Sequence, residues 1–191
     1  MADPMILILA GGEGRRIGGR KPLRRLAGRS LIDRVIDYAR DHTDLVALSV
    51  VRGGQARDLP QITDDPEIDG PLGGLASGLR FAREQEREFL LTLPCDMPFL
   101  PGDLLPLLKR AIDRSTVAVA SSGGFVHPVC ALWRAAALPA LVPYLASGER
   151  SLKGFAEAAG CVAVEWSERF DPFFNINTES DLAEAERRIA R

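Results

Sequence analysis

Unbroken apolar runs alternate along the chain with stretches in which apolar residues recur every three or four positions. The first run, Met5–Ala10, predicts a strand buried on both faces, as in a parallel sheet. Four later runs predict further strands at 45–51, 89–93, 116–120 and 129–133. The spaced apolar residues predict helices over 31–39, 72–82, 104–112, 135–145 and 152–158, and a last helix that opens at Thr178.

This alternation of strands and helices predicts a doubly wound α/β fold, with a mostly parallel sheet flanked by helices. No linker, repeat or low-complexity stretch divides the 191 residues, so we expect one domain over 1–191. Ser30 and Thr178 are candidate N-caps, the second with Asp181 in a capping box. Ligands of such sheets bind beyond the carboxyl ends of the strands, so the loops 10–22, 52–71 and 94–101 are the informative ones.

Composition narrows the class of protein. Apolar residues make up 46% and charged residues 26%, as in ordinary globular proteins, and the net charge is −2. That balance argues against a broad nucleic-acid-binding surface, and no apolar run is long enough for a membrane helix. The cysteines are three and widely spaced, with only two histidines. This pattern argues against zinc and disulfides and predicts buried free thiols in a cytoplasmic protein.

The near-neutral net charge of the whole chain hides a local excess of positive charge. Residues 11–34 contain eight basic and two acidic residues, a net charge of +6, whereas the other residues together carry −8. The excess predicts a small anionic ligand near the N-terminus. We expect Arg24, Arg25, Arg29 and Arg34 to face solvent rather than this ligand.

The segment that follows the first strand is rich in both glycine and basic residues. Five glycines lie between Gly11 and Gly19, together with Arg15, Arg16 and then Arg20 and Lys21. Glycine-rich turns expose backbone N–H groups that bind phosphate. The segment is neither a dinucleotide-binding motif, because position 17 is Ile17, nor a P-loop, because Arg20 and Pro22 replace its lysine and its hydroxyl residue.

A second candidate site residue follows the 89–93 strand. Asp96 stands in the sequence Pro94-Cys-Asp-Met-Pro98, where two prolines stiffen the backbone. A fixed carboxylate near a phosphate site suits Mg²⁺, which prefers oxygen ligands. The alternative is that Asp96 is a turn residue that only caps the helix region 101–112.

Four motifs in order resemble the molybdenum cofactor guanylyltransferase (MobA) family over nearly the whole chain. They are Leu9-Ala-Gly-Gly with Arg16-Ile-Gly-Gly and Lys21, Gly70-Pro-Leu-Gly-Gly-Leu, Pro94-Cys-Asp-Met-Pro, and Asn175-Ile-Asn-Thr. The resemblance implies a single Rossmann-like nucleotidyltransferase domain. It also implies the reaction: transfer of GMP from GTP to molybdopterin cofactor with release of pyrophosphate, dependent on Mg²⁺ with Mn²⁺ as an alternative. Implied partners are molybdenum-insertion proteins and molybdoenzyme chaperones.

The resemblance also implies residue roles. Arg16, Lys21 and Asp96 would be catalytic, with Asp96 as the metal ligand. Asn175 and Asn177, together with Arg150, would bind molybdopterin. The residues that would bind GTP are Leu9, Ala10, Gly11, Gly12, Lys21, Asp65, Gly70, Pro71, Leu72 and Asp96.

The chain departs from the family pattern in two places. Arg20 precedes Lys21 where many members have an aspartate, and Arg52-Gly53 replaces an asparagine region that contacts the nucleotide. Asp64 is adjacent to Asp65, so loop length decides which of the two matches the family's GTP-binding aspartate. Two other enzyme classes stay open: a molybdopterin cytidylyltransferase, whose first motif is typically Ala-Ala-Gly, and a sugar-phosphate nucleotidyltransferase. A non-catalytic nucleotide-binding adaptor of a molybdoenzyme is the third alternative.

One histidine and two tryptophans could bind a ligand, but structural roles are expected for them. His127 precedes Pro128 at a strand, where a structural or surface role is expected. Trp133 and Trp166 are expected in the core rather than as stacking platforms. No Ser/His/Asp or Cys/His arrangement for nucleophilic catalysis is evident in the sequence.

Overall fold

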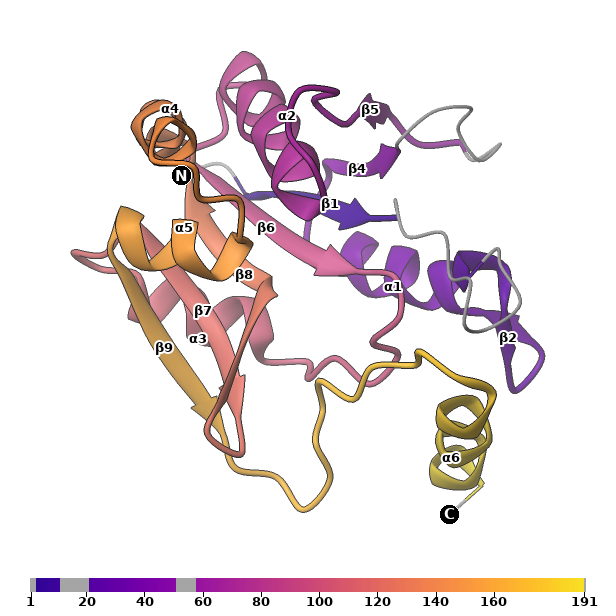
Figure 1. The fold of residues 1–191 in the computed structure, drawn as a ribbon. Helices are drawn as coiled ribbons and strands as arrows, with labels where there is room; N and C mark the ends of the chain where they lie inside the picture. The colour runs from indigo at the N-terminus through magenta and orange to yellow at the C-terminus, as the bar shows by residue number, and fades with distance from the viewer. Residues whose placement is uncertain (1–2, 11–20, 51–57, 191) are drawn as a thin grey trace.

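The computed structural model describes residues 3–10, 21–50 and 58–190. Its elements build one large sheet with helices on both faces and a small hairpin beside it (Figure 1). In chain order they are β1 (Met5–Leu9), η2 (Lys21–Leu23), β2 (Arg25–Leu26), β3 (Arg29–Ser30), α1 (Leu31–Arg40), β4 (Val46–Val50), β5 (Gln61–Thr63), α2 (Pro71–Glu84), β6 (Phe89–Pro94), α3 (Leu104–Ala111), β7 (Val117–Ser122), β8 (Phe125–Arg134), η3 (Ala135–Ala137), α4 (Leu138–Ala146), α5 (Leu152–Ala159), β9 (Cys161–Trp166) and α6 (Glu179–Ile189).

The large sheet has the strand order β5-β4-β1-β6-β8-β7-β9. β8 runs antiparallel to both of its neighbours, β6 and β7, and the other pairs are parallel. β2 and β3 form a separate antiparallel hairpin. The carboxyl ends of β1, β4, β5, β6, β7 and β9 therefore all lie along one edge of the sheet. The predicted mostly parallel α/β fold is confirmed.

Successive side chains of β1 point to opposite faces of the sheet and pack into two separate layers of the core. Ile6 and Ile8 pack with α1 and α3 on one face of the sheet, whereas Met5 and Leu7 pack with α2, α4 and α5 on the other. All four side chains are fully buried, as the unbroken apolar run predicts. Helix α6 lies apart from the sheet, next to β2 (Figure 1). There Leu26, Leu31, Ile176 and Ala185 form a third cluster.

The two predicted helix caps are confirmed. The Ser30 hydroxyl accepts a hydrogen bond from the Asp33 N–H at the start of α1. Thr178 and Asp181 form a reciprocal capping box at the start of α6: each side chain accepts from the other residue's backbone N–H. Such caps satisfy N–H groups that have no partner within the helix.

Other predictions need correction. The sequence pattern did not indicate β5 or β9, because β5 has three residues and β9 is an edge strand on which exposed and half-buried positions alternate. The predicted helix over 135–145 is divided into η3 and α4. Cys161, at the start of β9, is exposed, so the prediction that all three thiols are buried is wrong for it.

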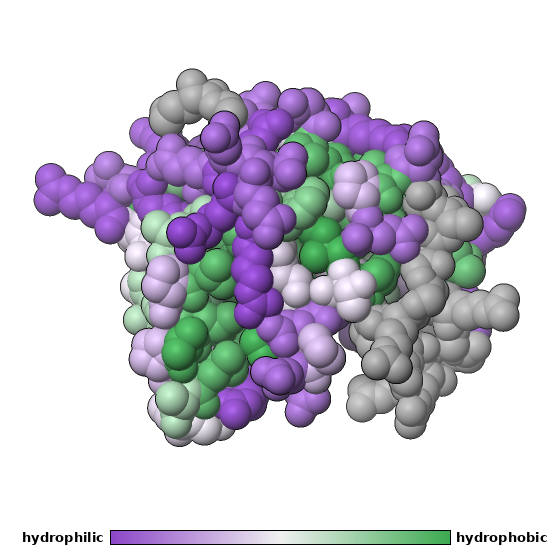
Figure 2. Space-filling model, turned by 90° about the horizontal axis from the view of Figure 1, so that it is seen from above, coloured by the Kyte–Doolittle hydropathy of each residue, from purple (hydrophilic) through white to green (hydrophobic). Residues whose placement is uncertain are grey.

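The surface mixes hydrophilic and hydrophobic areas. Seen from above, hydrophilic residues cover much of the molecule, and hydrophobic residues gather on the side where Figure 1 places α4 and α5 (Figure 2). Val142 of α4 is one of the exposed large hydrophobic residues. Among the described residues, no helix has both the length and the apolar character needed to cross a membrane.

Candidate active site

The ends of three parallel strands form the floor of the candidate site. Leu9, the last residue of β1, lies between Ser49 of β4 and Pro94 of β6 in the strand register. The Ala10 N–H continues the ladder by donating to the Ser49 carbonyl at 3.3 Å. The carboxyl ends of β1, β4 and β6 therefore lie side by side at one edge, where the fold class predicts ligand binding.

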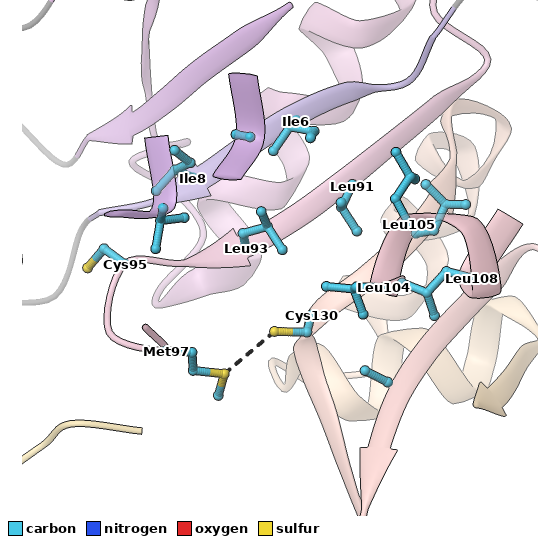
Figure 3. Close-up of a cluster of buried hydrophobic side chains, with 14 of the residues drawn as sticks. Ile6, Ile8, Leu91, Leu93, Cys95, Met97, Leu104, Leu105, Leu108 and Cys130 are labelled. Atoms are coloured by element: carbon cyan, nitrogen blue, oxygen red, sulfur yellow. Dashed lines mark hydrogen bonds between the residues drawn. The ribbon is translucent and has the colours of Figure 1, made fainter. Parts of the chain in front are cut away.

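Asp96 follows β6 at this edge and is only 8% exposed. Its neighbours Cys95 and Met97 are buried in the core, and the Cys130 thiol of β8 donates to the Met97 sulfur at 3.5 Å (Figure 3). Sulfur and aliphatic side chains thus anchor the turn on both sides of the carboxylate. Asp96 does not cap α3, whose N-cap is Asp103.

The Gly70-Pro-Leu-Gly-Gly motif brings the N-terminus of α2 against the end of β4. Gly70 has φ of 71°, a conformation that favours glycine, and Pro71 opens the helix. A Cβ on Gly74 would lie 2.5 Å from the Ser49 Oγ and 3.2 Å from a methyl group of Leu9. A side chain at position 74 would displace the Ser49 hydroxyl, so the glycine lets the first turn of α2 pack closely against the ends of β1 and β4.

The two adjacent aspartates differ in surroundings. The Ser49 hydroxyl donates a hydrogen bond to Asp64 Oδ1, and burial raises the pKa of Asp64. Asp65 instead forms an ion pair with Arg80 at 2.7 Å and accepts the Glu67 N–H at 3.0 Å. The hydrogen bond from the Arg80 guanidinium lowers the pKa of Asp65. Asp64 thus lies at the strand ends, whereas Asp65 is engaged with the outer side of α2.

The C-terminal segment returns to the same edge. The Ile176 N–H donates to the carbonyl oxygen of Asp96 at 3.0 Å, which places Asn175 and Asn177 on either side of a residue bonded to the turn after β6. Nearby, the guanidinium of Arg188 in α6 lies 4.1 Å from the ring centre of Phe174 and 6.0 Å from that of Phe99. This cation–π contact holds the segment against the loop after β6.

The remaining predicted site residues lie elsewhere or outside the described part of the chain. Arg150 donates to the carbonyl oxygens of Leu145 and Glu149, at the end of α4. Lys21 begins η2, but its side chain lies outside the described residues, as do Gly11, Gly12 and Arg16.

The expectation that Arg34 faces solvent is wrong, because its guanidinium is half-buried and donates to the Leu26 carbonyl at 2.6 Å. Arg24 forms an ion pair with Glu179 of α6 at 3.1 Å, with about a third of its side chain exposed. Both arginines support the hairpin and α6 rather than a ligand. Trp133 and Trp166 are buried, as expected.

Sequence reasoning missed one group of residues at this edge. The Ser122 hydroxyl lies within hydrogen-bond distance of both His127 and Asp171, although Asp171 is 44 positions from His127. The sequence drew attention only to His127, through the His127-Pro128 pair. Nothing in the spacing of residues related it to Ser122 or Asp171. Ser49, which contacts Asp64, was missed for the same reason.

A mostly parallel α/β sheet with a carboxylate and a glycine-opened helix at its carboxyl edge is typical of Rossmann-like nucleotide-binding domains. The model of the MobA-like NTP transferase domain matches residues 6–162. The chain belongs to this family.

Relatives from two bacteria carry the same name. Molybdenum cofactor guanylyltransferase from Cereibacter sphaeroides (strain ATCC 17023) is 42% identical over 185 residues, 94% of each chain. Its counterpart from Rhodopseudomonas palustris (strain BisB5) is 42% identical over 97% of this chain and 93% of its own.

Solved structures show the same fold. Molybdopterin-guanine dinucleotide biosynthesis protein A from Archaeoglobus fulgidus superposes with a TM-score of 0.78 at 24% identity, over 97% of this chain and 98% of its own. The 2-C-methyl-D-erythritol 4-phosphate cytidylyltransferase from Thermus thermophilus superposes with a TM-score of 0.71 at 18% identity, over 99% of this chain and 100% of its own. At these identities the likeness concerns the fold alone.

Proposed function

We propose that the chain transfers GMP from GTP to molybdopterin and releases pyrophosphate. The observation that carries the proposal is the hydrogen bond between Ile176 and Asp96, which brings the proposed metal-binding turn and the proposed molybdopterin-binding segment together. The identity of about 42% to the named guanylyltransferases supports the choice of reaction.

GTP would occupy the edge formed by β1, β4 and the start of α2. Leu9, Ala10 and the Gly70-Pro71-Leu72 turn line this edge, and the helix N-terminus favours a negatively charged ligand. Gly11, Gly12, Arg16 and Lys21 are proposed for the triphosphate from the sequence. Of the two aspartates, Asp64 is the better placed to meet the nucleotide, because Asp65 is engaged with Arg80.

Asp96 fits the magnesium ion that the family implies. Its carboxylate is a hard oxygen donor at the end of a strand, held between buried neighbours. Within the described ranges, no group of three or more His, Cys, Asp or Glu side chains gathers. One protein carboxylate completed by substrate phosphates and water is how Mg²⁺ is usually bound, and Mn²⁺ accepts the same ligands. When bound, the ion would neutralise phosphate charge and orient the reacting groups.

Molybdopterin would bind beside GTP, on the segment that carries Asn175 and Asn177. Amide side chains both donate and accept hydrogen bonds, as a pterin edge and a phosphate require. Arg150 is proposed as a further contact. Its guanidinium would first have to leave the Leu145 and Glu149 carbonyls that it binds in this structure.

The reaction needs no protein nucleophile. A phosphate oxygen of molybdopterin forms a bond to the α-phosphorus of GTP, and the bond from that phosphorus to the oxygen bridging to the β-phosphate breaks. The electron pair leaves with pyrophosphate, whose growing charge Lys21 and Arg16 would stabilise. Because the attacking phosphate is already ionised, the contribution of the protein is positioning and charge stabilisation.

A direct assay tests the proposal. Purified protein would be incubated with molybdopterin, Mg²⁺ and α-labelled GTP or CTP, and both pyrophosphate and labelled dinucleotide would be measured. We expect label transfer from GTP. Preference for CTP would indicate a molybdopterin cytidylyltransferase. Label transfer only to added sugar phosphates would indicate a sugar-phosphate nucleotidyltransferase. Binding of GTP without any turnover would indicate a non-catalytic adaptor. A cytoplasmic location, and association with molybdenum-insertion proteins or molybdoenzyme chaperones, belong to the same proposal.

A further inference from the structure

Three hydrogen-bonded polar side chains, Ser122, His127 and Asp171, lie beside the proposed molybdopterin-binding segment, where β7 and β8 meet residues 171–174. We call this group the polar chain. The Ser122 Oγ, at the end of β7, is 2.7 Å from the Nε2 of His127 in β8 and 2.8 Å from Asp171 Oδ1. Asp171 Oδ1 also accepts the N–H of Phe173 at 2.9 Å. The three side chains thus join the β7–β8 hairpin to the backbone of the C-terminal segment.

The direction of each hydrogen bond follows from the number of protons. A serine hydroxyl has a single proton, which Ser122 donates to the acceptor-only carboxylate of Asp171. Ser122 Oγ must then accept from an Nε2–H of His127. This direction is opposite to that of a nucleophilic serine, which gives its proton to the histidine. The group is therefore arranged to hold atoms in place rather than to attack.

Aromatic packing holds the same point of the segment. The ring of Phe173 stacks on the His127 ring with centres 4.7 Å apart, and the edge of Trp166 packs against it at 5.4 Å. The Trp166 indole N–H in turn donates to Asp103 at 3.0 Å. Phe173 is only 1% exposed. Its ring and its backbone N–H are thus both fixed by groups connected to His127.

This anchor lies next to the proposed site. Phe173 is held by the hairpin and Ile176 by the Asp96 carbonyl, so the peptide between them is fixed at both ends. Asn175 lies within this short span and Asn177 directly after it. Loosening the first anchor would leave Ile176 bonded to Asp96 and the Asn177 N–H bonded to Asp181 at 2.9 Å, but it would free the backbone that sets the position of Asn175.

We propose that His127 and Ser122 are positioning residues for the second substrate, acting through Asp171 and Phe173 on Asn175. This inference rests on the proposed function. It predicts that loss of the polar chain raises the KM for molybdopterin and leaves the KM for GTP unchanged, because the edge formed by β1, β4 and α2 is a separate part of the site.

Matched variants test the proposal. Ser122→Ala removes the central hydroxyl, and His127→Phe keeps a ring against Phe173 but removes the Nε2–H. We expect each to raise the KM for molybdopterin about tenfold, with kcat and the KM for GTP within about twofold. His127→Gln restores a donor at similar reach and should recover part of the loss. Asp171→Asn keeps the Oδ1 acceptor and should be the mildest change.

A second measurement does not depend on turnover. Hydrogen exchange followed by mass spectrometry should show faster exchange of the 171–177 peptide in Ser122→Ala, with β1 and α2 unchanged. Unchanged exchange and an unchanged KM would overturn the positioning role, as would an equal rise of both KM values. If Ser122→Ala does not fold, the same criteria apply to Asp171→Asn against Asp171→Ala. Wild-type protein that lacks molybdopterin-dependent pyrophosphate release would instead refute the proposed function, and the exchange result would show whether the anchor exists.

Discussion

The backbone N–H of Ile176 donates a hydrogen bond to the backbone carbonyl of Asp96, 80 positions earlier in the chain. The bond joins the turn after a central strand to the segment that precedes the last helix. Because both partners are backbone atoms, the side chain of Asp96 can be changed without removing the bond. The proposed metal-binding role and the structural role of this residue can therefore be separated experimentally.

Asp96→Asn should strongly reduce Mg²⁺-dependent pyrophosphate release while the fold is retained. Asparagine has almost the same size and remains neutral, so the charge that would bind the cation is lost but the turn is not. We expect kcat to fall by about 10²–10³-fold. Activity would be measured across a Mg²⁺ titration, and circular dichroism would report the fold. The exposed Asp113→Asn serves as the control. Wild-type turnover in Asp96→Asn would refute the metal role.

Gly73→Ala should destabilise the start of α2. Its Cβ would lie 2.4 Å from the Ile68 carbonyl oxygen and 2.9 Å from that of Asp65, and backbone atoms cannot rotate away as a side chain does. We expect a loss of about 1–3 kcal/mol in the free energy of unfolding, measured by urea denaturation. Gly102→Ala is the matched control, since nothing lies within 4 Å of its Cβ. It should change stability by less than about 1 kcal/mol. Equal effects of the two substitutions would contradict the close-approach argument.

Asp64→Asn and Asp65→Asn should shift stability in opposite directions. Burial raises the pKa of Asp64, because the ionised carboxylate is less stable in the folded protein than in water. The free energy of unfolding therefore decreases as pH rises and Asp64 becomes ionised. Asp64→Asn should therefore be more stable than wild type at pH 7, and the gain should shrink as pH falls towards about 4.

The pKa of Asp65 is lowered by Arg80, so this residue contributes stability above the ordinary aspartate pKa, and the contribution is lost as pH falls through the lowered value. Asp65→Asn should cost up to about 1 kcal/mol at pH 7, because the Arg80 partner is half-exposed. Thermal unfolding from pH 3 to pH 8 measures both variants. Shifts of the same sign would show that the two carboxylates do not differ as described.

Lys21→Ala should weaken GTP binding by at least tenfold, since a lysine that contacts phosphate contributes a charge-assisted hydrogen bond of about 1.5–3 kcal/mol. Arg25→Ala is a matched control from the same basic segment, because Arg25 is exposed and donates to the Gly28 carbonyl at 3.4 Å. Binding would be measured by calorimetry at two salt concentrations. Similar losses in the two variants would indicate a general effect of positive charge rather than a specific contact.

Strong local patterns made much of the fold predictable from the sequence. The unbroken run at β1 predicted burial on both faces, and Ser30 and Thr178 marked the helix starts that the structure shows. The pattern failed at β9, where the alternation of an edge strand is weak. The antiparallel direction of β8 was not predicted either, because the direction of a strand depends on its connections rather than on its own residues.

The candidate site was predictable to the extent that its residues lie in short motifs. Asp96 was proposed because it follows a predicted strand, and the Gly70-Pro-Leu turn because it matches a motif of the family that the sequence resembles. The difference between Asp64 and Asp65 required the structure, since it depends on which side chain meets Ser49 and which meets Arg80. The polar chain at His127 was not predictable, because its members are distant in sequence and hydroxyl groups have no distinctive spacing.

The arrangement of the C-terminal segment has a consequence for synthesis of the protein. A nascent chain that ends before residue 171 already contains all seven strands of the large sheet, with Asp96 at its edge. It lacks the backbone N–H of Ile176 and both asparagines. Under the proposed site assignment, products of incomplete translation would hold the nucleotide edge but lack the acceptor edge, and guanylyl transfer would begin only when the segment after β9 has left the ribosome.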